Sequence, residues 1–215
     1  MQVLIGTTNK AKEERLKWLL TRIPADVLTL RETAGSDSSN LEEIGRTHKE
    51  NACIKAKQLS EAHGLCTLAS DGGLLIPILE GSWDSLTTHR FAGPAADDHE
   101  RSRRLLELMR SYKGDDRKAQ WVEAIAVAAE GKILACWQVQ GPTGFLSEQL
   151  HSDTESIEGG FWVFDIWYFP ELRKTYSQLN EDELLTINDH WTLLKDLLEQ
   201  FFADYEAGNI QQCSA

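Results

Sequence analysis

The first twenty residues restrict the fold of this chain more than any other segment. The apolar run at residues 2–6 predicts a short buried strand, and residues 7–10 (Thr-Thr-Asn-Lys) predict a polar turn. A helix is expected from about residue 10 to residue 22, because leucines at positions 16, 19 and 20 recur at helical spacing. A buried strand that leads directly into an amphipathic helix is typical of α/β proteins, and we therefore expect an α/β fold.

Strands and helices continue to alternate along the chain. Further helices are expected at about residues 47–62, 98–112 and 188–205, and further strands at residues 65–69, 120–129 and 132–139. Sharp turns are expected at two glycine-bearing segments, residues 70–73 and 141–144. Because no repeat or linker divides the chain, we expect one domain or two tightly joined lobes over residues 1–215, with a loose tail from about residue 208.

The charge and the cysteines limit the classes of partner. The net charge of −12 disfavours a nucleic-acid polymer and an anionic membrane surface, because both are negatively charged. A small phosphorylated ligand remains compatible, since local cations and a divalent metal can outweigh the overall sign. No apolar run is long enough to span a bilayer, and the four scattered cysteines predict reduced thiols in the cytoplasm.

The turn at the end of the first strand is a candidate phosphate site. Thr7, Thr8 and Asn9 precede a helix, and backbone N–H groups at a helix N-terminus favour an anion. Lys12, on the first turn of that helix, adds a positive charge. The alternative is an ordinary helix cap with exposed lysines, which the local pattern alone favours.

Acidic residues at two positions are candidates for binding a metal. Glu42 and Glu43 precede the second helix, and clustered carboxylates of this kind can bind Mg²⁺, although they can equally be solvated charges beside a helix cap. Asp71 follows the apolar strand at residues 65–69 in a glycine-rich turn. It can serve as a metal ligand or as the base that activates water, or it can be an ordinary turn residue.

Two later segments are candidates for contact with a nucleotide. Arg90 lies in a predicted loop and can clamp a phosphate, although a surface arginine is the simpler interpretation. The aromatic run from Phe161 to Phe169 can stack on a purine ring, or it can form the core or a dimer interface. The interior or interface interpretation is slightly favoured for the aromatic run.

The order and spacing of these segments are more specific than any one of them. Together they resemble the inosine-triphosphate pyrophosphatase family, which hydrolyses deaminated purine nucleoside triphosphates such as ITP, dITP and XTP. The resemblance covers nearly the whole chain and is strongest over residues 3–93. The motifs that carry it are Thr7-x-Asn9-x-x-Lys12, Glu42-Glu43-x-Gly45-x-Thr47-x-x-Glu50-Asn51-Ala52-x-x-Lys55-Ala56, Leu68-Ala69-Ser70-Asp71-Gly72-Gly73-Leu74 and Arg90-Phe91-Ala92-Gly93.

The resemblance implies a fold and a set of roles. The implied fold is a long mixed sheet with flanking helices and two lobes around a central cleft, usually in a homodimer. The implied reaction uses Mg²⁺ and releases pyrophosphate and a nucleoside monophosphate. By position, Thr7, Asn9 and Lys12 would bind the triphosphate, and Lys55 and Arg90 would line the cleft. Metal would be bound by Glu42, with Glu43 as the alternative, and by Asp71, which would also orient or deprotonate the attacking water.

The chain departs from this family in its second half and at one acid. Ser70 replaces the first acid of the family's Ala-Asp-Asp-Ser-Gly segment, and Leu184 stands where the family has a lysine. The family's Gly-Phe-Gly-Tyr-Asp-Pro segment corresponds to residues 160–166, so that Phe161, Trp162 and Asp165 are carried over as substrate-binding residues. The Ser-His-Arg that contacts the purine corresponds to Asn188, Asp189 and His190. Because Asp accepts rather than donates hydrogen bonds, both a family-like base preference and an altered one remain open, and a base with an amino group is one option for the second.

Three functions remain open on these grounds. The favoured one is an active Mg²⁺-dependent nucleoside-triphosphate pyrophosphatase. The second is a nucleotide-binding or regulatory protein with weakened catalysis, suggested by Ser70 and Leu184. The third is an interaction protein whose tryptophans form a partner surface.

Overall fold

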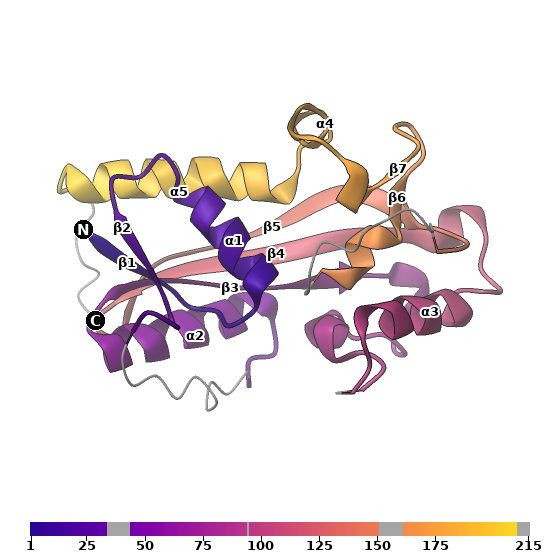
Figure 1. Ribbon diagram of the computed structural model, residues 1–215, viewed down its shortest axis with the longest axis horizontal. Coiled ribbons are helices and arrows are strands. Elements are labelled where there is room, and N and C mark those ends of the chain that lie inside the picture. Colours follow the sequence, from indigo (N-terminus) through magenta and orange to yellow (C-terminus); the bar gives the residue numbers. More distant parts are fainter. Residues whose placement is uncertain (34–43, 94, 151–160, 210–215) are drawn as a thin grey trace. The chain divides into compact units, whose positions relative to one another are not determined.

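The computed structural model describes residues 1–33, 44–93, 95–150 and 161–209. Within these ranges the strands form a seven-stranded sheet of order β2-β1-β3-β4-β5-β6-β7 (Figure 1). The strands are β1 (Gln2–Ile5), β2 (Asp26–Thr29), β3 (Cys66–Leu75), β4 (Lys118–Ala129), β5 (Lys132–Leu146), β6 (Trp167–Phe169) and β7 (Lys174–Thr175). The α-helices are α1 (Lys10–Leu19), α2 (His48–His63), α3 (Asp98–Leu108), α4 (Glu181–Thr186) and α5 (His190–Glu206). The expected α/β fold with a mixed sheet and flanking helices is confirmed.

The chain divides into two compact units. The first contains residues 1–71, 123–139 and 190–215, and the second contains residues 72–122 and 140–189. Three strands, β3, β4 and β5, begin in one unit and end in the other, so the chain passes between the units within regular strands.

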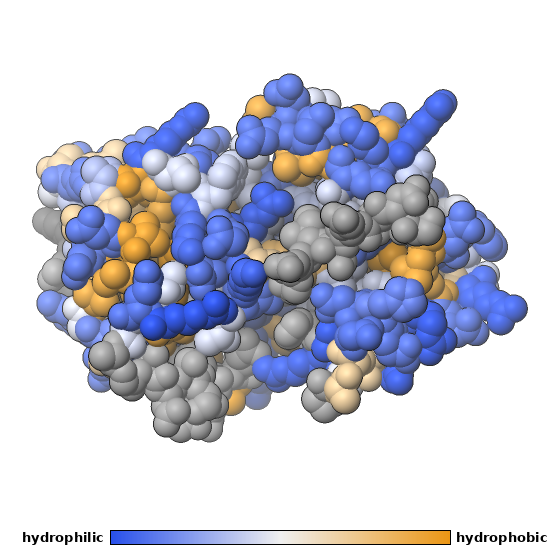
Figure 2. Space-filling view, viewed as in Figure 1, coloured by the Kyte–Doolittle hydropathy of each residue, from blue (hydrophilic) through white to orange (hydrophobic). Residues whose placement is uncertain are grey.

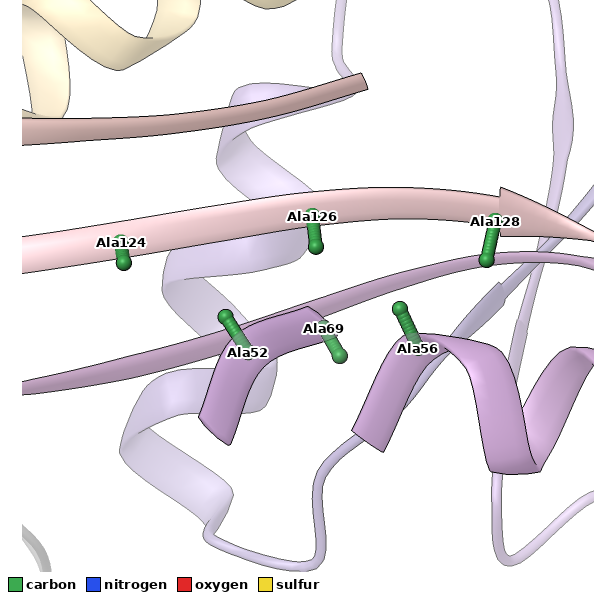
Figure 3. Packing of buried hydrophobic residues seen from close by; sticks show 6 residues of the cluster. All are labelled: Ala52, Ala56, Ala69, Ala124, Ala126 and Ala128. Atoms are coloured by element: carbon green, nitrogen blue, oxygen red, sulfur yellow. The ribbon is translucent and has the colours of Figure 1, made fainter. Parts of the chain in front are cut away.

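The first unit has helices on both faces of its strands. Strand β1 pairs in parallel with β2 and with β3. Helix α2 lies on one face, where a cluster of fully buried alanines separates it from β3 and β4; these are Ala52, Ala56, Ala69, Ala124, Ala126 and Ala128 (Figure 3). Helices α1 and α5 lie on the other face (Figure 1), and Trp137 of β5 packs on Phe201 of α5. Side chains as small as alanine allow the axis of α2 to approach the strands closely.

Local side-chain and backbone features define both ends of α2. The Thr47 side chain caps the helix by accepting a hydrogen bond from the Glu50 N–H, and Gly64 ends it at a φ of 64°. A complete capping box would place the Glu50 carboxylate on the Thr47 N–H. It accepts instead from the N–H of Arg46, one residue earlier, at 2.6 Å.

The second unit has an aromatic core. Trp167 is fully buried, its Nε1 donates to the Ala119 carbonyl at 3.1 Å, and its ring stacks with that of Tyr176. Arg117 is also buried, and its guanidinium donates to carbonyl oxygens of residues 109, 112, 146 and 147. This one side chain therefore joins the end of β5 to the segment that follows α3.

Both predicted turns at residues 70–73 and 141–144 are wrong, because β3 and β5 continue through them. The glycines serve close packing rather than chain reversal. A Cβ on Gly73 would lie 2.0 Å from the Ser85 carbonyl oxygen, and one on Gly144 would lie 2.6 Å from Nε1 of Trp167. Neither position can accept a larger residue without displacing its neighbour.

The other expected elements are present, with changes at their ends. The hairpin at Glu130 and Gly131 joins β4 to β5, and both residues have positive φ angles. Helix α3 ends at Leu108, earlier than predicted, and α4 was missed. The predicted tail begins with residues 208 and 209, and its remaining residues, 210–215, lie outside the described ranges.

Hydrophilic residues cover most of the face in Figure 2, and hydrophobic residues gather in smaller patches between them. In the described part of the chain, no helix combines the length and the apolar character that crossing a membrane requires.

Candidate functional site

The candidate site of the first unit is built around Asp71. This residue lies within β3 rather than in a turn, and its side chain is largely buried. Side chains two residues apart on a strand point to the same face, so Asp71 shares the face of Ala69, which packs against α2. The carboxylate therefore points to the face of the sheet that α2 covers and not to an exposed edge.

Helix α2 supplies two donors to this carboxylate. His48 Nδ1 lies 2.7 Å from Asp71 Oδ2, and Lys55 Nζ lies 2.9 Å from Asp71 Oδ1. His48 and Lys55 are both buried and are seven residues apart, which places them on the same side of the helix two turns apart. Each oxygen of Asp71 is thus held by a different residue of the same rigid element.

The environment keeps Asp71 ionised. Burial alone would raise the pKa of its carboxyl group, but the hydrogen bond from His48 and the positive charges of Lys55 and Lys12 outweigh this effect. The pKa of Asp71 consequently lies well below its usual range. An ionised carboxylate only accepts hydrogen bonds, so the Nδ1 atom of His48 must carry the proton and donate it to Oδ2.

The turn before α1 is organised as a helix cap. The Asn9 side chain accepts from the Lys12 N–H at 3.0 Å, and Thr7 Oγ1 accepts from the Asn9 N–H at 3.2 Å. Thr8 is exposed. The cap that the local pattern favours is confirmed, and it leaves the phosphate-binding role of this turn as a prediction.

Lys12 connects this turn to a second buried carboxylate. Its Nζ lies 3.9 Å from Oε1 of Glu123, which is on β4 and has no exposed side-chain surface. Lys12 also acts on Asp71 through its charge. The first unit therefore gathers two cations, Lys12 and Lys55, and two carboxylates, Asp71 and Glu123, from α1, α2, β3 and β4.

The remaining predicted residues of the second unit differ in their burial. Arg90 is exposed at the end of a short 3₁₀ helix (Ser85–Arg90). Phe161 and Trp162 are buried, and the ring of Phe161 stacks on that of Phe164 at 4.8 Å. This agrees with the core interpretation of the aromatic run. For Asp165, burial raises the pKa of the carboxyl group, and a hydrogen bond with a neighbouring serine opposes this only in part.

Of the residues that correspond to the base-contacting segment, Asp189 and His190 are buried and Asn188 is exposed. Asp189 belongs to the second unit and is almost completely buried, and its Oδ1 accepts a hydrogen bond from the Tyr176 hydroxyl at 2.5 Å. His190 belongs to the first unit, where it begins α5, and its ring lies 5.2 Å from that of Trp191. Asp189 thus already has one strong internal partner.

Among the described residues, the carboxylate oxygens of Asp71 are of the kind that Mg²⁺ binds. Mg²⁺ prefers carboxylate oxygens, and proteins often bind it through one or two carboxylates together with substrate phosphates and water. Asp71 offers such oxygens, and one described donor to each leaves capacity for a further contact. Glu42 and Glu43 lie outside the described residues. Within the described ranges, no group of three or more His, Cys, Asp or Glu residues is placed to hold a metal.

Sequence reasoning missed His48 and Glu123. The spacing of His48 and Lys55 is a signal that could have identified the first, because positions seven apart share a helix face. Glu123 interrupts the otherwise apolar run at residues 121–129, and a lone charge in a buried strand segment is unusual unless it is paired.

Comparisons with known proteins point in one direction. Residues 3–200 match the Ham1 family. A dITP/XTP pyrophosphatase of Thermus thermophilus is 32% identical over 213 residues, covering 94% of this chain and 92% of that relative. A dITP/XTP pyrophosphatase of Bacillus cereus is 30% identical over 200 residues, covering 93% and 94%. The solved structure of a HAM1 protein from Coxiella burnetii has a TM-score of 0.75 and 26% identity, covering 93% of this chain and 99% of that one.

Proposed function

This chain belongs to the Ham1 family, and on that basis we propose that it hydrolyses a nucleoside triphosphate to the monophosphate and pyrophosphate. The proposed substrate is a deaminated or otherwise modified nucleotide such as dITP, ITP or XTP. The relatives named dITP/XTP pyrophosphatases support the substrate class. The observation that carries the proposal for this chain is the buried Asp71 carboxylate, held by His48 and Lys55 and acted on by the charge of Lys12.

The chemistry requires water to attack the α-phosphorus. A new P–O bond forms to the water oxygen, the bond to the bridging oxygen breaks, pyrophosphate leaves with the electron pair, and the proton lost by the water passes to the solvent. Lys12 and Lys55 are suited to balance the charge of the phosphates. Asp71 is suited to bind and orient rather than to store a proton, because a carboxyl group with a strongly lowered pKa is a weak base near neutral pH.

We include Mg²⁺ in the proposal, with Asp71 and either Glu42 or Glu43 as its protein ligands. When bound, the cation would offset phosphate charge and polarise the reacting oxygens. Thr7, Thr8 and Asn9 are proposed to contact phosphate through the N-terminus of α1. Arg90 is proposed as a further phosphate contact, and Phe161, Trp162 and Asp165 as contacts to the nucleoside.

The selection of the base is proposed to involve Asp189 and His190. Asp189 Oδ1 is engaged by Tyr176, so its influence would operate through the remaining oxygen or through the position of Tyr176. The test is an Asp189→Ala variant assayed with dITP, XTP, dATP and dGTP. A changed ranking of kcat/KM supports the role, and an unchanged ranking at lower overall activity rejects it.

The decisive experiment measures pyrophosphate release with Mg²⁺ across ordinary, deaminated and modified nucleoside triphosphates. In ¹⁸O-labelled water, attack at the α-phosphorus places the label in the monophosphate, whereas attack at the β-phosphorus places it in the pyrophosphate. Asp71→Asn should lower kcat by on the order of a hundredfold to a thousandfold. Asp115→Asn, which changes an exposed carboxylate in the second unit, is the matched control and should retain full activity.

The alternative is a nucleotide-binding protein with weakened catalysis. Ser70 favours it, because a buried serine occupies the position at which the resemblance implies an acid. In that case no nucleotide would yield pyrophosphate, while a nucleoside triphosphate with Mg²⁺ would still raise the melting temperature.

We further propose a cytoplasmic homodimer. Analytical ultracentrifugation over a tenfold range of protein concentration tests the dimer, and cell fractionation tests the compartment. A monomer at all concentrations would reject the first part of this proposal.

A further inference from the structure

The side chain of His48 is buried against Asp71, although its position at the start of α2 does not require burial. His48 is the first residue of α2, where a solvent-exposed polar side chain would suffice to begin the helix, yet its side chain is only 6% exposed. The buried ring is directed at Asp71, on a strand that lies 23 residues further along the chain. A buried, directional contact between two separate elements indicates a purpose beyond helix initiation.

The two donors to Asp71 differ in what they can control. Lys55 ends in a rotating ammonium group on a long flexible stem, so it contributes charge with little directional preference. The imidazole of His48 is a rigid planar ring whose N–H bond has one direction, and burial fixes the ring in place. The direction of the Asp71 carboxylate is therefore set mainly from the Oδ2 side, by His48 Nδ1.

We propose that His48 is a positioning residue, which fixes the orientation of the Asp71 carboxylate so that its remaining lone pairs face the reacting groups. This inference rests on the proposed hydrolysis and deepens it by assigning a role to a residue at an unspecified position of the second motif. Lys55 supplies balancing charge, and His48 supplies direction. Catalytic groups lose rate steeply when their orientation is relaxed, so the expected effect lies in kcat rather than in binding.

The test uses three substitutions that differ in where a donor is placed. In Asn, the amide nitrogen is attached to Cγ and takes the place of Nδ1, so His48→Asn retains a donor at the correct distance. In Gln, the amide lies one carbon further out and approximates Nε2, so His48→Gln has the same group in the wrong place. His48→Leu has no donor.

The expected result is a separation of kcat from KM. His48→Leu should lower kcat about 10-fold to 100-fold, the range found when partners of catalytic or metal-binding side chains are removed. The KM for dITP should change by less than about threefold, because His48 does not itself need to touch substrate. His48→Asn should recover most of the lost kcat, and His48→Gln should not.

The comparison of Asn with Gln carries the test even if the Leu variant does not fold. If His48→Asn and His48→Gln lose kcat equally, or if each loss follows the fall in melting temperature, His48 has only a structural role and the inference is wrong. Full activity in His48→Leu alongside an inactive Asp71→Asn would also overturn it while leaving the proposed hydrolysis intact. A wild-type protein that releases no pyrophosphate, by contrast, would remove the proposed function together with this role.

Discussion

The two compact units have cores of opposite kinds. In the first unit, helix α2 packs on the sheet through alanines (Figure 3). Charged side chains gather around Asp71, which follows Ala69 by two residues on β3. In the second unit, large rings fill the interior, including Trp167, Phe164 and Tyr176. Small side chains bring backbones close enough for short polar contacts, whereas large rings bury more apolar surface. We therefore expect the first core to control the geometry of the site and the second to contribute more to stability.

The largest effect should come from the second core. Trp167→Ala should lower the free energy of unfolding by about 3–5 kcal/mol, because it removes a fully buried ring and a hydrogen bond to the Ala119 carbonyl. Urea unfolding measures this loss. Trp137→Ala, at a half-buried position in the first unit, is the matched control and should cost clearly less. Equal losses would show that the contrast between the two cores has no energetic meaning.

A smaller effect on stability, with a larger effect on activity, should follow from overpacking the first core. Ala126→Leu adds three carbons between β4 and α2 and should destabilise the protein by about 1–3 kcal/mol. Because α2 carries His48 and Lys55, we expect kcat to fall even in protein that remains folded. Ala203→Leu introduces the same side chain on the exposed side of α5 and should change neither quantity. Normal kcat in folded Ala126→Leu would separate the alanine core from the site.

The sequence predicted the elements of these cores better than their contacts. The strand and helix at residues 2–19 and the caps of α2 depend on neighbouring residues, and local patterns identify them. The course of β3 through Gly73 depends on the carbonyl of Ser85, which is twelve residues away, and local patterns cannot show it. The contact between His48 and Asp71 likewise depends on how a helix docks on a strand. The motifs identified Asp71 and Lys55 but could not show what holds them.

Acidification should change the stability contributions of Asp71, in the first unit, and Asp165, in the second unit, in opposite directions. The folded-state pKa of Asp71 is lowered, so its contribution to stability is present above the unfolded pKa of about 3.9 and is lost as the pH falls towards the folded value. The folded-state pKa of Asp165 is raised by burial, so its ionisation opposes folding above pH about 4, and acidification relieves that cost.

Two variants compare these signs directly. In metal-free buffer at pH 7, Asp71→Asn should be less stable than the wild type, and this difference should shrink below pH about 4. Asp165→Asn should be as stable as the wild type or more stable at pH 7, with the difference disappearing in acid. Urea unfolding at a series of pH values gives both curves. If the stability difference from the wild type changed with pH in the same direction for both variants, Asp71 and Asp165 would not make opposite contributions.

The smallest expected effect is a change in the labelling rate of a partly buried cysteine, which shows whether the two units unfold separately or together. The three described cysteines, Cys53, Cys66 and Cys136, belong to the first unit, and burial raises the pKa of Cys66 to about 11. A thiol with this pKa has little reactive thiolate at pH 8 and should react with an aromatic disulfide reagent roughly a hundredfold more slowly than an ordinary exposed cysteine. The measurement requires a chain in which the other three cysteines are replaced by serine or alanine. Urea should then accelerate the labelling of Cys66.

The urea concentration at which labelling of Cys66 accelerates distinguishes cooperative unfolding of the whole chain from earlier unfolding of the first unit. Strands β3, β4 and β5 each continue from one unit into the other, so opening the first unit alone would break strands in the middle. We therefore expect labelling and circular dichroism to give the same urea midpoint, as a single cooperative transition requires. Labelling at clearly lower urea would mean that the alanine core opens first. The site would then lie in the less stable part of the molecule, and the shared strands would not couple the two cores.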